Sequence, residues 1–217
     1  VEQVSCCSDR LGLREVVRSL DYFRCVEYPL ATAALALEPH LDLLDMGCGR
    51  GPYALFLAAQ RGLRVRALDL DPEALDWQRR GALRLALAPA EFATVEADSR
   101  DLPFPEASFD RVLNLGSIEH IRGNGDAVAA AEMARVLRPG GLAVLTVPVS
   151  AHEQEIEAGP HVPGFERRYD DGALERRLIG PSGLAEIGRT YYGEPGFELS
   201  RWWYGLPRLL RLPLRRL

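Results

Sequence analysis

The sequence lacks lysine, has few cysteines and contains no long apolar run. All 26 basic residues are arginine, which we interpret as biased genomic composition and not as a functional signal. The four cysteines, Cys6, Cys7, Cys25 and Cys48, have neither the spacing of a zinc site nor the pattern of a disulfide framework. They favour a reducing, cytoplasmic compartment. No apolar run reaches transmembrane length and no signal peptide is evident, which argues against a membrane-spanning or secreted protein.

The charge balance is slightly acidic. With 26 basic and 31 acidic side chains, the formal net charge is −5, which argues against a general nucleic-acid-binding protein. The 217 residues suit one domain with a sizeable core. The chain begins at Val1, as is typical of a trimmed or partial sequence.

One stretch, LDMGCGRGPYAL at 44–55, organises the rest of the chain. An apolar run ends in an acidic residue, three spaced glycines follow, and a proline opens a helical pattern. These residues are Asp45, Gly47, Gly49, Gly51 and Pro52. Glycine permits positive φ and lets a ligand approach the backbone, and free N–H groups at a helix start attract a carboxylate or phosphate. The stretch therefore predicts a strand, a tight turn and a helix that together cradle a cofactor.

Two cofactors compete for this cradle. A dinucleotide site prefers G-x-G-x-x-G/A, but here Pro52 stands at the sixth position. Asp45 would repel a pyrophosphate by about 1 kcal/mol in water, and by more when buried. S-adenosylmethionine instead brings an α-ammonium and a sulfonium. Asp45 can attract the ammonium while the helix start receives the carboxylate, so this cofactor is favoured over a nicotinamide.

Apolar segments of strand length alternate with helical patterns through the first two thirds of the chain. We expect strands at 40–46, 64–70, 92–97, 109–115 and 142–149, with a turn at 138–141 before the last of these. Alternating strands and helices predict a parallel sheet covered on both faces.

Acidic residues end three successive strands of this pattern. Asp69 lies 69 − 47 = 22 positions after the first glycine of the turn, which suits a carboxylate that accepts from ribose hydroxyls. Asp71, before Pro72, is the better candidate for the N-cap of the next helix. Asp98 is placed to accept from the exocyclic amine of adenine, and the alternative is a turn residue. Together with Asp45, these tips indicate one crevice at the carboxyl ends of the strands.

The segment before the first strand reads as helix over residues 9–37, with Pro29 separating two helices. We favour packing of this segment on the sheet. The alternative is that Tyr22, Arg24 or Tyr28 covers the cofactor or the substrate.

Taken in order, LDMGCGRG, VRALDLDP, VEADSRDLPFPEASFDRVLN and RVLRPGGLAVLTVP resemble one known family. Across residues 40–150 the chain resembles class I S-adenosylmethionine-dependent methyltransferases, in particular the ubiquinone-biosynthesis-like group called methyltransferase type 11. The resemblance implies an α/β, Rossmann-like, doubly wound sheet of seven strands, mostly parallel with an antiparallel last strand.

The same resemblance implies a set of cofactor contacts. It implies that Asp45, Gly47 and Gly49 line the methionine end of the cofactor and that Asp69 binds the ribose. It also implies Asp98 with Ser99 near the adenine, and Asn114 beside the methionine moiety. The product would be S-adenosylhomocysteine.

Glu119-His120 follows the fourth expected strand. In a metal-dependent branch of the family a Glu-x-x-Glu-His pattern binds a divalent ion, but here Gly116 stands at the first position, so we expect no metal. His120 as a general base has a suitable imidazole. A structural role for it is favoured, and no catalytic residue is assigned.

The C-terminal third reads as a polar lid over 151–172, then a short helix capped by Asp170 or Asp171. GLAEIGRTYYGE and GFELSRWWY look like two final strands around a turn at 194–196. Four aromatic residues there indicate either an apolar pocket or core: Tyr191, Tyr192, Trp202 and Trp203. The ending WWYGLPRLLRLPLRRL is either a basic amphipathic segment for peripheral membrane contact or a docked or frayed terminus.

We therefore expect a single domain with N-terminal helices (1–39), a cofactor-binding core (40–150), a substrate insertion (151–182) and final strands with a basic end (183–217). The predicted activity is transfer of the sulfonium methyl group to a small-molecule or lipid-like acceptor, with no nucleic-acid partner. The alternatives are a non-catalytic cofactor-binding partner subunit and, less favoured, a nicotinamide-dependent oxidoreductase.

Overall fold

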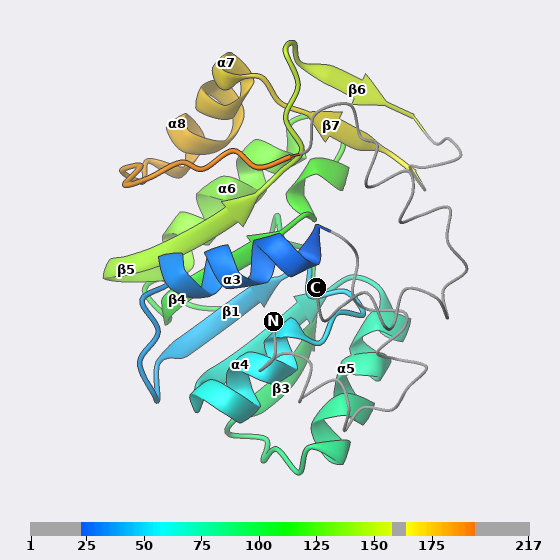
Figure 1. The fold of residues 1–217 in the computed structure, drawn as a ribbon, viewed down its shortest axis with the longest axis vertical. Helices are drawn as coiled ribbons and strands as arrows, with labels where there is room; N and C mark the ends of the chain where they lie inside the picture. Colours follow the sequence, from blue (N-terminus) through cyan, green and yellow to red (C-terminus); the bar gives the residue numbers. More distant parts are fainter. Residues whose placement is uncertain (1–22, 158–163, 194–217) are drawn as a thin grey trace.

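The computed structural model describes residues 23–157 and 164–193, and a parallel sheet of five strands forms its centre (Figure 1). The strand order is β3-β2-β1-β4-β5, and every neighbouring pair is parallel. The strands are β1 (Asp42–Met46), β2 (Arg64–Asp69), β3 (Phe92–Glu96), β4 (Phe109–Leu115) and β5 (Leu137–Thr146). The predicted α/β, Rossmann-like architecture is confirmed, with strands close to the expected segments.

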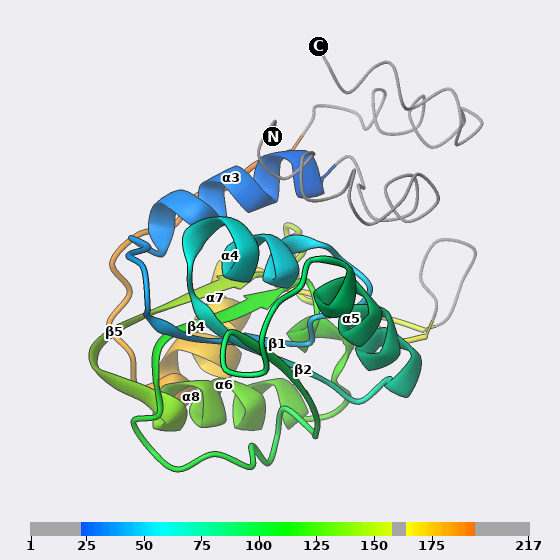
Figure 2. The same cartoon turned by 90° about the horizontal axis from the view of Figure 1, so that it is seen from below.

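Helices cover both faces of the sheet, as Figure 2 shows in edge-on view. On one side lie α3 (Arg24–Ala34) and α4 (Tyr53–Arg61), while α5 (Pro72–Arg84) contacts β2 and β3. On the other side lies α6 (Gly125–Val136). From β1 the chain continues to β2 and β3 on one side, and then returns to β4 and β5 on the other. The switch point is therefore between the carboxyl ends of β1 and β4, where open α/β sheets bind their ligands.

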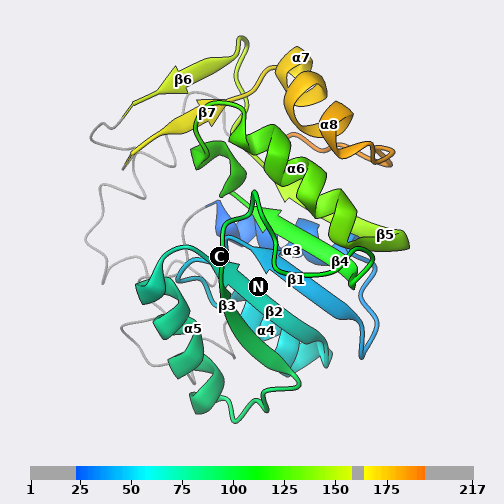
Figure 3. The same cartoon turned by 180° about the vertical axis from the view of Figure 1, so that it is seen from behind.

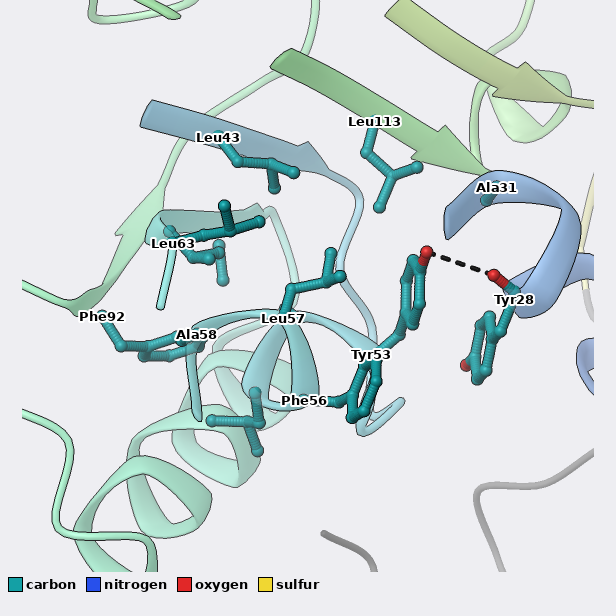
Figure 4. Close-up of a cluster of buried hydrophobic side chains, with 14 of the residues drawn as sticks. Tyr28, Ala31, Leu43, Tyr53, Phe56, Leu57, Ala58, Leu63, Phe92 and Leu113 are labelled. Atoms are coloured by element: carbon teal, nitrogen blue, oxygen red, sulfur yellow. Dashed lines mark hydrogen bonds between the residues drawn. The ribbon is translucent and has the colours of Figure 1, made fainter. Parts of the chain in front are cut away.

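The core on the α3–α4 side consists of aliphatic and aromatic side chains (Figure 4). Leu57 of α4 and Leu113 of β4 are fully buried. Burial of such a side chain contributes about 1.5–3 kcal/mol. The rings of Tyr28 and Tyr53 stack with centroids 4.4 Å apart, and the Tyr53 hydroxyl donates to the Tyr28 carbonyl oxygen at 3.3 Å. These contacts fix α3 against the start of α4.

Two local expectations about breaks in regular structure were wrong. Pro29 lies inside α3 and separates no helices, because burial of Tyr28 and Ala31 offsets the one backbone hydrogen bond that proline removes. The expected turn at 138–141 lies within β5, as a shift in its register with β4. Residues 9–22 lie outside the described residues.

The segment expected to be a loop or lid contains regular structure. Strands β6 (Gln154–Ile156) and β7 (Glu166–Arg168) pair antiparallel in a small second sheet (Figure 3). A short helix α7 (Asp171–Leu174) follows, and the carboxylate of its N-cap Asp170 accepts from Ala173 N at 2.7 Å, as predicted. A π-helical turn η2 (Glu175–Ile179) and α8 (Gly180–Ser182) complete this region.

The expected final strands are not seen among the described residues. Residues 184–193 form no strand, and the side chain of Ile187 is 81% exposed, so no buried apolar face supports pairing there. The expected strand after the turn at 194–196 and the basic C-terminal segment lie outside the described residues. No helix within 23–157 or 164–193 is long and apolar enough to span a bilayer.

A buried ionic network joins the β6–β7 hairpin to α6. Arg167 and Asp126 are both fully buried, and Arg167 Nη1 donates to Asp126 Oδ2 at 2.6 Å. The Tyr169 hydroxyl donates to the same oxygen at 3.0 Å, and Arg177 reaches Oδ1 at 3.3 Å. Because the charges are buried together, removal of one leaves the others uncompensated.

We predict that Asp126→Ala lowers the free energy of unfolding by about 3 kcal/mol, because the buried Arg167 guanidinium loses its only fully buried carboxylate partner among the described residues. The more exposed carboxylates of Glu153 and Glu155 still pair with it. Urea denaturation followed by circular dichroism would measure the change. Glu157→Ala, which removes an exposed ion pair with Arg122, is the matched control and should have little effect. Equal stability of the two variants would show that the network does not hold the hairpin.

Candidate cofactor site

A cavity of about 300 Å³ opens at the switch point of the sheet. Its walls are the glycine turn after β1, the end of β4 at Leu115 and Gly116, and side chains from α3 and α4. Arg24 and Tyr28 of α3 line it, although the same helix also packs on the sheet. The interpretation that this helix packs on the sheet is confirmed, and the cover of a ligand by Arg24 or Tyr28 stays a prediction. The cavity volume falls at the lower end of small-molecule sites.

The turn after β1 is held by hydrogen bonds from its backbone to that of β2. Gly47 N and Cys48 N both donate to the carbonyl oxygen of Leu68, at 2.8 and 3.0 Å. Gly47 has φ +78°, and a Cβ on it would lie 1.9 Å from Ser117 Oγ. Only glycine satisfies both the conformation and the close approach at this position.

Two side chains from the β2–α5 unit clamp the same turn. Asp69 Oδ2 accepts from Gly49 N at 2.8 Å, and its Oδ1 accepts from Asp71 N at 2.9 Å. Asp71 is the N-cap of α5, as predicted. The fully buried Gln78 donates from Nε2 to the carbonyl oxygens of Gly49 and Gly51, at 3.0 and 2.9 Å.

Sequence reasoning did not identify Gln78. The available signal was a polar residue on the stripe of α5 that otherwise carries small and apolar buried residues such as Leu75 and Ala82. A buried amide on such a stripe requires hydrogen-bond partners, and the backbone of a neighbouring turn can supply them.

Opposite charges line the cavity. Asp45 is 5% exposed, and no described residue donates a hydrogen bond to its carboxylate. Burial raises the pKa of Asp45 to about 7, and the Arg24 guanidinium counteracts part of this rise. Arg24 Nη1 donates to Leu115 O at 3.0 Å and also pairs with Glu27. The cavity therefore presents a carboxylate without a partner and a guanidinium, which suits a zwitterion.

The other predicted contacts do not line this cavity: Asp69, Asp98, Ser99 and Asn114. Asp98, after β3, is half-buried and forms a bidentate pair with Arg100, which holds the pKa of Asp98 below its usual range. Ser99 follows in the same turn. Asn114 is fully buried, where its Nδ2 donates to Met46 O at 2.9 Å and its Oδ1 accepts from Ile118 N at 3.1 Å. Its amide thus joins β1 to the turn after β4.

The Glu119-His120 pair lies on a short 3₁₀ helix, η1 (Ile118–His120), directly after β4. Glu119 is buried, and His120 Nδ1 lies 2.7 Å from the carbonyl oxygen of Phe165. Within the described ranges, no three His, Cys, Asp or Glu side chains are grouped closely enough to hold a metal ion.

The chain is similar in sequence to a known protein family and to several of its members. Residues 44–145 match the model of a methyltransferase domain. A fatty-acid O-methyltransferase of Mycolicibacterium smegmatis is 37% identical over 148 residues, which cover 67% of this chain and 48% of that protein. A protein of Mycobacterium tuberculosis named "probable fatty acid methyltransferase" is 33% identical over 183 residues, covering 83% of this chain and 41% of that protein. The chain thus spans less than half the length of these two relatives.

A solved structure is also similar. The 1,6-didemethyltoxoflavin-N1-methyltransferase of Burkholderia thailandensis, with 1,6-didemethyltoxoflavin and S-adenosylhomocysteine bound, superimposes with a TM-score of 0.58 at 26% identity. The match covers 71% of this chain and 64% of that chain. Because the family model and the relatives match in sequence and this structure matches in fold, the chain belongs to the class I S-adenosylmethionine-dependent methyltransferases.

Proposed function

We propose that the protein transfers the methyl group of S-adenosylmethionine to a lipid-like small molecule. The observation that carries the proposal is the buried Asp45 carboxylate, which faces the switch-point cavity without a hydrogen-bond partner from the described residues. In its ionised form, a buried carboxylate of this kind is stabilised by a cationic ligand. The two mycobacterial relatives named for fatty acids support a lipid-like acceptor.

The amino-acid end of the cofactor fits the two charges in the cavity. Asp45 would hold the α-ammonium, and Arg24 would hold the carboxylate together with the start of α4. The Gly47 and Gly49 backbones allow this end of the cofactor to approach closely. Arg24 was named from the sequence only as an alternative that covers the cofactor or the substrate, and its position in the cavity wall supports this role.

The nucleoside end would lie along the tips of β2 and β3. Each oxygen of the Asp69 carboxylate accepts one backbone hydrogen bond and keeps a further lone pair, so the ribose hydroxyls can donate to it. Asp98 with Ser99 would receive the adenine amine beside the Arg100 pair. Asn114 would act at the methionine moiety by holding the turn that carries Gly116.

When bound, the cofactor supplies a methyl group already activated by its sulfonium. What the chain supplies is then proximity and alignment of the acceptor for in-line displacement. Because the cofactor activates the methyl group and the chain aligns the acceptor, the absence of a strong catalytic motif in the sequence is expected.

We predict that Asp45→Asn and Arg24→Met each weaken binding of S-adenosylhomocysteine by about 10- to 100-fold, because each removes a charge-assisted contact. Neither change should weaken 5′-methylthioadenosine, which lacks the amino-acid end. Isothermal titration calorimetry would measure both ligands, with Asp76→Asn on the exposed side of α5 as the control. Equal loss for both ligands would mean a structural role, and binding of NADH in place of S-adenosylhomocysteine would overturn the proposed function.

A different pattern is expected at the β2 tip. Asp69→Asn should weaken S-adenosylhomocysteine and 5′-methylthioadenosine by similar factors, about 10-fold or more, because both ligands carry the ribose that it would bind. The same titrations test this prediction. A loss confined to S-adenosylhomocysteine would place Asp69 at the amino-acid end instead.

Binding should also depend on pH through Asp45. The pKa of this carboxyl is raised to about 7 in the free protein, and an ammonium ligand favours its ionised form. Affinity for S-adenosylhomocysteine should therefore be full above about pH 7 and fall by up to about tenfold per unit below it, with proton release on binding. Asp45→Asn should flatten this profile, and an unchanged profile in that variant would assign the titration to another group.

A further inference from the structure

A second buried carboxylate, Glu119, lies behind the end wall of the cavity. Glu119 is 5% exposed, and its Oε2 is buried without a hydrogen-bond partner among the described residues. Gly116, which lines the cavity, separates it from the cofactor site. A Cβ at Gly116 would lie 3.4 Å from Glu119 Oε1 and 3.2 Å from Arg24 Nη2. Glycine at this position therefore leaves the carboxylate next to the cavity.

Beyond the cofactor carboxylate that Arg24 would hold, the charges around Glu119 make this end of the cavity unfavourable for a second anion. Arg24 already pairs with Glu27, and the Tyr192 hydroxyl donates to Glu27 at 3.3 Å. The charged and titratable groups that act on Glu119 come from α3, η1, β7 and the segment after α8: Arg24, His120, Glu166 and Tyr192. With Glu119 itself and the Glu27 beside Arg24, three carboxyl groups lie here. Acidic groups outnumber basic ones here, so an acceptor that brings a proton fits better than a carboxylate.

His120 provides a route for that proton to solvent. Its Nδ1 lies 2.7 Å from the Phe165 carbonyl oxygen, which can only accept, so Nδ1 carries a hydrogen. The other ring nitrogen, Nε2, lies 3.8 Å from Glu119 Oε1, and the His120 side chain is 45% exposed. This distance is longer than a hydrogen bond, as catalytic contacts often are before the substrate binds. In the neutral ring Nε2 is therefore an acceptor between the buried carboxylate and water.

We propose that Glu119 is the general base of the methyl transfer and that the acceptor is a neutral hydroxyl compound, a phenol or an alcohol. The acceptor oxygen forms a bond to the methyl carbon while the carbon–sulfur bond breaks, and the electron pair of that bond stays on sulfur. The hydroxyl proton passes to the Glu119 carboxylate and then through His120 Nε2 to water. The proposal rests on the proposed function and specifies its acceptor class.

The protonation behaviour of Glu119 agrees with this role. Burial raises its pKa to about 7, while His120 and Arg24 counteract part of the rise. A base with a pKa near the working pH is both available in its ionised form and strong enough to accept a proton.

The test compares the wild-type protein with Glu119→Gln on a panel of phenols and primary alcohols, with and without an alkyl chain, and on a saturated fatty acid. We expect the wild type to methylate hydroxyl compounds, with a rate that falls below about pH 7. Glu119→Gln should lower kcat by about 100-fold or more, remove this acid limb and leave S-adenosylhomocysteine affinity unchanged. Glu157→Gln, on an exposed carboxylate, is the control.

A second variant separates proton transfer from structure. His120→Gln removes the imidazole that lowers the pKa of Glu119, so the acid limb should move to higher pH. An unmoved limb would remove His120 from the proton route. Undiminished kcat in Glu119→Gln, or wild-type methylation of the fatty acid alone, would overturn the proposal. So would S-adenosylhomocysteine binding without turnover of any hydroxyl compound, whereas failure to bind that ligand would overturn the proposed function itself.

Discussion

The Asp45 carboxylate is buried at the end of β1, where the described residues give it no hydrogen bond. Burial of a charge without a partner is costly, and the rise of its pKa to about 7 expresses that cost. The surrounding structure keeps it there nonetheless, because β1 is the central strand and its end meets that of β4 at the switch point. A position of this kind is stabilised by a ligand that brings a positive charge, and the cavity beside it has room for one.

One wall of that cavity, the glycine turn after β1, is fixed by hydrogen bonds to its backbone atoms. Leu68 accepts from two successive N–H groups of the turn, Asp69 accepts from a third, and Gln78 donates to two of its carbonyl oxygens. The turn is therefore fixed from β2 and α5 before any ligand arrives, which lowers the ordering cost of binding. The Asp69 carboxylate would take part in two interactions, since it accepts from Gly49 N and is also the candidate to bind the ribose. Its four lone-pair positions allow both.

The features that were predicted correctly from the sequence are those that local interactions determine. The strand segments and the caps at Asp71 and Asp170 followed from apolar runs and from residue types that bond their own backbone. The errors at Pro29 and at 184–193 arose where packing decides: buried contacts keep α3 continuous, and an exposed segment has no face with which to pair. Gln78, which was not predicted, contacts the turn across 27 and 29 positions of sequence, and Arg24, which was only an alternative, contacts Leu115 across 91. No pattern of residue spacing in the sequence predicts such long-range contacts.

Arg24 links the two ends of the cavity, because its guanidinium lowers the pKa of both Asp45 and Glu119. The two carboxyls have similar burial and similar pKa values, so their different roles must come from what each faces. Asp45 lines the cavity beside the glycine turn, whereas Glu119 lies behind Gly116 with His120 as its connection to water. The ammonium of the cofactor would favour the ionised form of Asp45, and its sulfonium, which S-adenosylhomocysteine lacks, would favour that of Glu119. Cofactor binding would then prepare Glu119 as a base before the acceptor enters, so the charge of the cofactor also sets the order of the reaction.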